Sequence, residues 1–119
     1  MMWIDVVESG EWLRQLYDVV PSLEQIRSYR LTVEEGGSHI EIGMFLPVPL
    51  DHSAVRGRGS NGIGFALIFE GVRSFRGHVI GEHLVASAEL KEVDGQVVFH
   101  GSDKYTDFTI VADRVSIRK

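Results

Sequence analysis

Hydrophobic side chains fall on alternate positions along most of the chain from residue 26 onward, and this alternation limits the fold more than any other feature. The stretch HIEIGMFL shows the pattern clearly, since the residues on one side of it are Ile40, Ile42, Met44 and Leu46. A period of two places such residues on one face of a β-strand, whereas an amphipathic helix needs them three or four positions apart. The alternation therefore predicts a mainly β protein.

Turn signals divide the alternating region into short strands. The segments on either side of Gly36 and Gly37 predict a hairpin, in which Tyr29, Leu31 and Val33 share one side of the first strand. The expected strands, in chain order, are residues 26–35, 39–46, 63–70, 72–80, 84–93, 96–101, 107–112 and 114–118. About eight short strands at this spacing predict an antiparallel β-sandwich or open barrel.

The other local signals complete this picture of a single domain. Asp94-Gly95 is the strongest turn signal in the chain and predicts a second hairpin. One short helix is expected over residues 10–18, capped by Ser9 and ended by Pro21. Its apolar face is expected to consist of Trp12, Leu13, Leu16 and Tyr17. The 119 residues contain no repeat or linker, so we interpret residues 1–119 as one β domain.

Gly57, Gly59 and Gly62 stand at the spacing of a dinucleotide-binding fingerprint. That fingerprint requires a strand before the glycines and a helix after them, because the helix N-terminus holds the pyrophosphate. Here Pro47 and Pro49 precede the glycines and a strand pattern follows them. We therefore interpret this segment as a long loop and expect no nucleotide or other cofactor.

Catalytic and metal-binding patterns are weak in this chain. There is no cysteine, and none of the five histidines stands at a zinc-ligand spacing. Asp51, His52 and Ser53 are the residue types of a hydrolase triad, but consecutive side chains do not converge on one reacting atom. We therefore expect no metal ion, no catalytic residue and no enzyme activity.

The N-terminal sequence lacks the basic start and long apolar run of a secretory signal. The most apolar stretch, IGFALIF, has seven residues and is too short to span a membrane. A cytoplasmic location is therefore expected.

Charge is distributed unevenly along the chain. Residues 1–50 contain eight acidic and three basic residues, a balance of −5, whereas residues 51–119 contain nine of each. An acidic half repels nucleic acid and anionic lipid and attracts basic protein surfaces. We therefore expect a protein partner and neither nucleic acid nor membrane.

Three motifs carry a resemblance to a known family. The first is Trp12-x4-Tyr17-x3-Pro21-Ser22-Leu23, and the others are FEGV at residues 69–72 and FTIVADRVSIR at the end of the chain. With these motifs and its series of strands, nearly the whole chain resembles the immunity protein family numbered fifty of bacterial polymorphic toxin systems.

This resemblance implies a mostly β fold and a non-catalytic role. Such a protein is made beside a toxin gene, stays in the cytoplasm, and binds and blocks the cognate toxin domain. The resemblance also implies that Trp12, Tyr17, Pro21 and Leu23 belong to the core, and the apolar helix face suggests the same for Trp12 and Tyr17.

Two regions are candidates for binding such a toxin. If the toxin is basic, the acidic residues around the expected helix would attract it, and these are Asp5, Glu8, Glu11 and Asp18. The second candidate is the loop of residues 51–61, which carries His52, Arg56 and Arg58.

Two other functions remain open from the residues alone. A small-ligand or carbohydrate-binding β-sandwich or barrel would contain a sizeable apolar cavity with a few convergent polar groups. An enzyme would contain a cleft with at least two histidines or a histidine–carboxylate pair.

Overall fold

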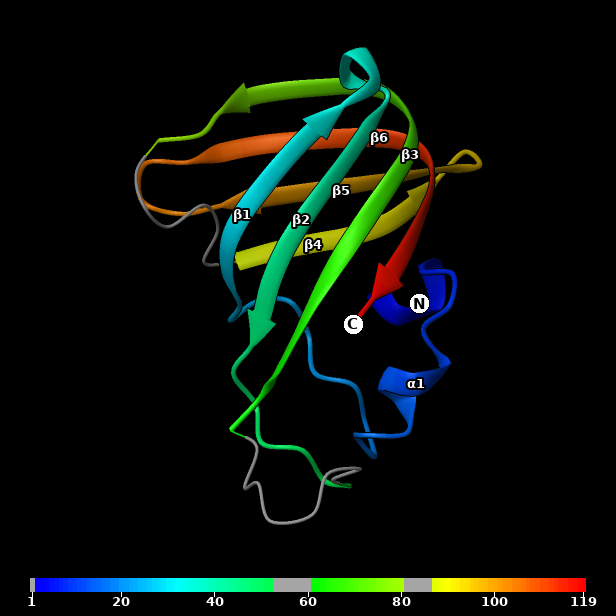
Figure 1. The fold of residues 1–119 in the computed structure, drawn as a ribbon, viewed down its shortest axis with the longest axis vertical. Helices are drawn as coiled ribbons and strands as arrows, with labels where there is room; N and C mark the ends of the chain where they lie inside the picture. The colour runs from blue at the N-terminus through cyan, green and yellow to red at the C-terminus, as the bar shows by residue number, and fades with distance from the viewer. Residues whose placement is uncertain (1, 53–60, 81–86) are drawn as a thin grey trace.

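The alternating segments form one open antiparallel sheet of six strands in the computed structural model, which describes residues 2–52, 61–80 and 87–119 (Figure 1). The strands are β1 (Arg27–Glu34), β2 (His39–Leu46), β3 (Ile63–His78), β4 (Ser87–Val93), β5 (Gln96–Ser102) and β6 (Asp107–Arg118). Their order across the sheet is β1-β2-β3-β6-β5-β4, so β1 and β4 are the edge strands. The mainly β, antiparallel class predicted from the sequence is confirmed.

Two pairs of expected strands are continuous, which is why the described residues form fewer strands than the eight expected. Residues 63–70 and 72–80 join into β3, and residues 107–112 and 114–118 join into β6. The sequence pattern predicts a break at Gly71, between residues 70 and 72, but its positive φ of 63° allows the strand to bend without ending. The sequence therefore predicted the strand segments correctly and their separation wrongly.

The bend in β3 and β6 turns the sheet through a corner. The register between the two strands shifts between Val72 and Ser74. Across the corner, the buried positions of β6 change from alternate spacing to a gap of three, between Ala112 and Val115. Both strands curve there in Figure 1, so that β1 and β2 cross in front of β4 and β5. Strands that bend from one layer into another are typical of orthogonally packed β-sheets, and the core lies between the two arms.

The first hairpin is confirmed, but one of its side chains faces the other way. β1 pairs with β2, and the register shifts between Ser28 and Arg30. This bulge leaves Tyr29 61% exposed and directs Ser28, which is 2% exposed, toward the core. The Ser28 hydroxyl donates a hydrogen bond to the Gly43 carbonyl at 3.1 Å, which satisfies the buried polar group. The expected shared face of Tyr29, Leu31 and Val33 is therefore wrong for Tyr29.

The second hairpin follows its turn signal. β4 and β5 pair from Ser87↔Ser102 to Val93↔Gln96, and Asp94 and Gly95 both have positive φ. These angles match the two-residue turn that Asp-Gly predicts. Ala88 and Leu90 are buried, while Glu89 and Lys91 are exposed, so the two faces of β4 alternate.

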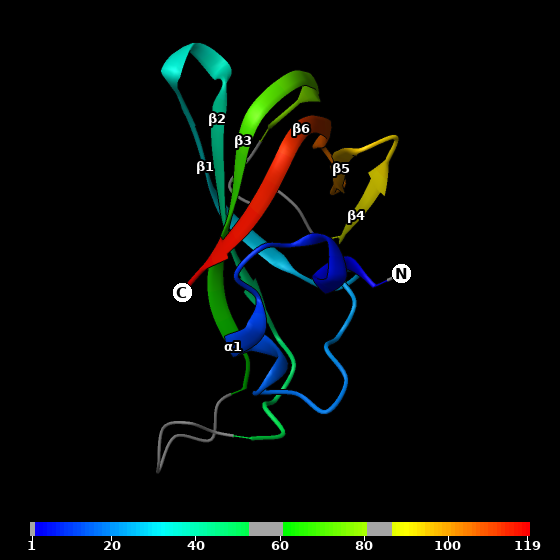
Figure 2. The same ribbon diagram turned by 90° about the vertical axis from the view of Figure 1, so that its right-hand side faces the viewer.

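Residues 2–26, which we call the N-terminal cover, pack on the open side of the sheet (Figure 2). The cover contains two short turns of helix, η1 (Trp3–Val6) and α1 (Glu11–Arg14). Its buried apolar residues are Trp3, Ile4, Val7, Leu13, Leu16, Tyr17, Val20, Leu23 and Ile26. Their burial closes the core, so the cover is a structural part of the domain.

The expected helix over residues 10–18 is much shorter than predicted. Ser9 has a positive φ of 64° and does not cap it, and α1 ends at Arg14. Beyond α1, the carbonyl of Leu16 accepts hydrogen bonds from the main-chain N–H groups of Asp51 and His52, each at 3.0 Å. These bonds take the place of the next helical hydrogen bonds, so tertiary contacts override the local helical pattern.

No helix in the described ranges is long and apolar enough to cross a lipid bilayer.

Candidate functional site

The four acidic residues proposed for partner binding all lie on the solvent side of the N-terminal cover. Most apolar residues of the cover are buried in the core, whereas Asp5, Glu8, Glu11 and Asp18 are exposed. Their exposure follows from the amphipathic sequence of the cover, in which buried and charged positions are interleaved. All four charges, which span fourteen residues of sequence, are therefore exposed to solvent.

Each of these acids has a different local setting. Asp5 forms an ion pair with Arg14 and accepts a hydrogen bond from the main-chain N–H of Met2. The hydrogen bond from Arg14 is the main reason that the pKa of Asp5 lies below its ordinary value. Glu8 pairs through its main chain with β6, next to Ser116. Glu11 lies in the first turn of α1.

Asp18 connects the acidic cover to the second candidate region. Its carboxylate lies 2.6 Å from Nε2 of His52, and both side chains are exposed. The hydrogen bond with Asp18, and then the negative charge of Asp18, favour the protonated imidazole, so the pKa of His52 is raised above its ordinary value. The main-chain N–H of Asp18 also donates to the Asp51 carboxylate at 2.9 Å. The start of the 51–61 loop is therefore tied to the cover, while Arg56 and Arg58 lie outside the described residues.

A small hollow of about 170 Å³ lies between the two helical turns of the cover. Its lining includes Met2, Arg14, Tyr17, Asp18 and Val19. Val19 is 71% exposed and is bordered by the Asp18 and Arg14 charges. An exposed apolar residue inside a charged rim is a common arrangement at the centre of protein interfaces.

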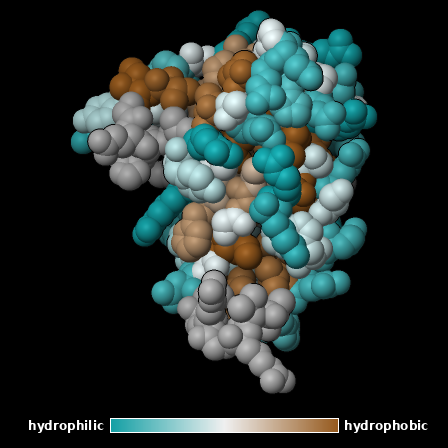
Figure 3. Space-filling model, viewed as in Figure 1, coloured by the Kyte–Doolittle hydropathy of each residue, from teal (hydrophilic) through white to brown (hydrophobic). Residues whose placement is uncertain are grey.

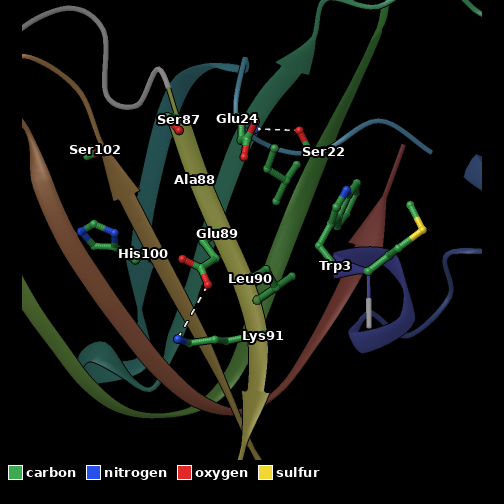
Figure 4. A pocket seen from close by; sticks show the side chains of 12 residues that line it. Trp3, Ser22, Glu24, Ser87, Ala88, Glu89, Leu90, Lys91, His100 and Ser102 are labelled. Carbon is green, nitrogen blue, oxygen red and sulfur yellow. Dashed lines mark hydrogen bonds and ion pairs between the residues drawn. The ribbon is translucent and has the colours of Figure 1, made fainter. Parts of the chain in front are cut away.

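A larger groove of about 450 Å³ lies between the cover and edge strand β4 (Figure 4). Its lining residues are Met2, Trp3, Ser22, Leu23, Glu24, Ser87, Ala88, Glu89, Leu90, Lys91, His100 and Ser102. Sequence reasoning missed this groove, because it joins four segments that are far apart in the chain. The only sequence signal was that β4 belongs to a hairpin, which left its other edge undetermined.

One of the residues that line the groove, His100, belongs to a histidine–carboxylate pair whose aspartate is not part of the lining. Nε2 of His100 lies 3.2 Å from Oδ1 of Asp107 on the neighbouring strand. Both side chains are about half exposed, so water screens the pair. Ser87 and Ser102 line the same groove, but no hydroxyl in the described part of the chain hydrogen-bonds to His100. The pair is therefore not enclosed in this groove, and the described residues place no nucleophile beside its imidazole.

Metal binding has no support in the described ranges. They contain no group of three or more histidine, aspartate or glutamate side chains arranged to hold an ion. His39 begins β2, and His52 contacts Asp18 of the cover. His78 and His100 lie on the two strands that flank β6, where His78 pairs with Asp107 in the ladder and His100 contacts the Asp107 carboxylate. His83 is outside the described residues.

Hydrophilic side chains dominate the face shown in Figure 3, and the apolar side chains appear in separate small groups. This face does not resemble the broad apolar surface of an obligate interface.

Comparison with known proteins supports the fold and leaves the function open. No family model matches the chain, and no curated protein matches it. A similar fold occurs in the crystal structure of an uncharacterized protein from Neisseria gonorrhoeae, with 9% sequence identity and a TM-score of 0.54. The match covers 81% of this chain and 92% of that chain. At this level of identity, the likeness concerns the fold alone.

Proposed function

We propose that this chain is a toxin-neutralising immunity protein, which binds and blocks a cognate polymorphic toxin domain in the bacterial cytoplasm. The observation that carries this proposal is the exposed acidic side of the N-terminal cover. Residues 2–26 contain five acidic residues and one basic residue, while nine of their apolar side chains are buried in the core. An exposed acidic surface of this kind is suited to steering and binding a basic protein domain.

The motifs that carry the family resemblance have a structural role consistent with this proposal. Tyr17 and Leu23 are buried, and the Tyr17 hydroxyl donates to the Val48 carbonyl at 2.7 Å. Trp12 is half-buried, with Nζ of Lys119 lying 5.2 Å from its ring centroid. These residues hold the cover in place, which leaves its charged side available to a partner.

Co-expression tests the proposal directly. The C-terminal domain of a large secreted toxin encoded beside this gene should arrest bacterial growth when it is expressed in the cytoplasm. Co-expression of this chain should restore growth, and the two purified proteins should form a complex of equal stoichiometry. Failure of the chain to rescue growth or to bind that domain would refute the proposal.

A ligand-binding module remains the alternative because of the groove beside β4. The groove is open, however, and its polar side chains lie on both sides of the strand instead of converging on one point (Figure 4). Ligand-binding sites usually combine an enclosed apolar space with convergent polar groups. The arrangement of this groove is therefore better explained by contact with another polypeptide.

A further inference from the structure

The groove beside β4 runs along the edge of the strand. Every residue of β4 from Ser87 to Lys91 lines it. A hollow on one face of a sheet is lined by alternate residues of a strand, because successive side chains point to opposite faces. Only a hollow at the edge contacts consecutive residues, and there it exposes the main chain. In Figure 4, Leu90 points toward Trp3, while Glu89 and Lys91 project on the side of His100.

The main-chain groups at this edge are oriented for hydrogen bonding. The N–H of Ala88 points away from β5 and donates to the Leu23 carbonyl at 2.8 Å. Main-chain groups of an antiparallel strand alternate in direction, so those of Leu90 and Glu92 also point away from β5. The cover thus hydrogen-bonds to one end of the edge through Leu23, and η1 packs beside the strand across the groove. The outward main-chain groups of Leu90 and Glu92 have no main-chain partner in the described ranges.

A second copy of this chain is a poor occupant of the open edge. In a symmetric antiparallel pair centred on Leu90, the second copy would need to bond to the outward N–H of Ala88. That N–H already donates to the Leu23 carbonyl. Pairing centred on Lys91 would place two lysines directly opposite each other, and pairing centred on Glu92 would do the same with two glutamates. Like charges directly opposite each other destabilise a strand pair.

We propose that the free edge of β4 binds an extended segment of the partner protein, which adds to the sheet as a further strand beside Leu90 and Glu92. The inference rests on the proposed function, since it names the contact through which the toxin domain is held. Strand addition obtains affinity from main-chain hydrogen bonds and specificity from the side chains on either side.

The walls of the groove define the chemistry of this segment. Trp3, Leu23 and Leu90 form an apolar wall on the core side. Glu24 and Glu89 are acidic, and Lys91 pairs with Glu89 at 3.7 Å, so the lining has an excess of negative charge. The segment therefore carries an apolar residue toward Trp3 and at least one basic residue toward the acidic side chains.

A proline substitution tests the edge without changing the β4–β5 ladder. Glu92 is exposed and its N–H points away from β5, so Glu92→Pro removes one outward donor and obstructs an added strand. Glu92→Gln is the matched control, because it removes the charge and keeps the N–H. With the adjacent toxin domain as probe, Glu92→Pro should weaken binding by about tenfold or more. Glu92→Gln should stay within about threefold of the original protein.

Amide hydrogen exchange on the unmodified protein provides a second test, which does not depend on the variant folding. The amides of Leu90 and Glu92 should exchange rapidly in the free protein and slow by about a hundredfold in the complex. The amides of Glu89 and Lys91, which bond to β5, should be slow in both states.

The outcomes separate the two proposals. If a complex forms but these amides remain unprotected and folded Glu92→Pro binds normally, strand addition is wrong and the immunity role stands. If no complex forms, both proposals fail. If the free protein is a dimer with Leu90 and Glu92 already protected, a second copy occupies the edge and the inference is overturned.

Discussion

His52 and Asp18 show how a single contact joins two regions that the sequence treats as separate. They are 34 positions apart, and the sequence makes each a partner-binding candidate for a different reason. The two side chains contact each other, and the Asp51 carboxylate accepts a hydrogen bond from the main-chain N–H of Asp18. The start of the loop and the cover therefore form one surface. Residue types identified the candidates, but only the fold brings these two together.

This contact predicts that the stability of the folded protein depends on pH. The pKa of His52 is raised from 6.5 in the folded protein, so the folded state binds the proton more tightly. The resulting stabilisation is fully present below pH 6.5 and is lost as the pH rises through the raised pKa. In a histidine-resolved NMR titration, Asp18→Asn should lower the pKa of His52 toward its ordinary value. An identical titration curve in both proteins would contradict the contact.

Charge reversal on the cover predicts a salt-dependent loss of binding. Glu11 is the best position, because Glu8 also pairs through its main chain with β6. Glu11→Lys should weaken toxin binding several-fold at low salt and by less at high salt, since ions screen exposed charges. Glu34→Lys, at the tip of the β1–β2 hairpin, is the control and should bind normally. Equal affinities and salt slopes for the two variants would remove the acidic surface from the proposed interface.

At the scale of elements, the corner in β3 and β6 decides the architecture. The alternating pattern predicted nearly every strand segment, because side-chain period is a local property of the chain. It did not predict the corner, because a glycine in an apolar run indicates either a turn or a bend. Whether the glycine forms a turn or a bend depends on the partner strand. There Asp113 fills the space beside Gly71 and accepts two hydrogen bonds of 3.0 Å from Arg73.

Gly71→Ala should therefore destabilise the protein by about 1–3 kcal/mol. The added methyl group requires an unfavourable positive φ and collides with the Asp113 side chain. Gly64→Ala in the same strand is the matched control, because its nearest neighbour would be the Met44 carbonyl oxygen at 3.9 Å. Its free energy of unfolding should change by less than about 0.5 kcal/mol. Urea denaturation of both variants measures the difference, and equal midpoints would show that the corner does not need glycine.

At the scale of the whole molecule, the cover and the sheet share one core. Nine of the 26 buried apolar residues in the described ranges belong to the cover. The cover also pairs with two strands through main-chain hydrogen bonds, from Glu8 to β6 and from Leu23 to β4. The order of the strands and the groove beside β4 were beyond sequence reasoning, because both depend on contacts between distant segments. A period of two reveals which side chains are buried, and it carries no information on which strand edge is left open.

This shared core predicts that cover and sheet unfold together. Both tryptophans of the chain, Trp3 and Trp12, lie in the cover, so tryptophan fluorescence reports on the cover and far-UV circular dichroism on the sheet. The two signals should give the same transition in urea.

Leu13→Ala, at a fully buried position of the cover, should shift both transitions equally by about 2–5 kcal/mol. Val19→Ala, at an exposed position, should shift neither. A fluorescence transition that precedes the dichroism transition would mean that the cover is a separately stable arm, and the acidic surface would then lack the rigid support that the proposed function requires.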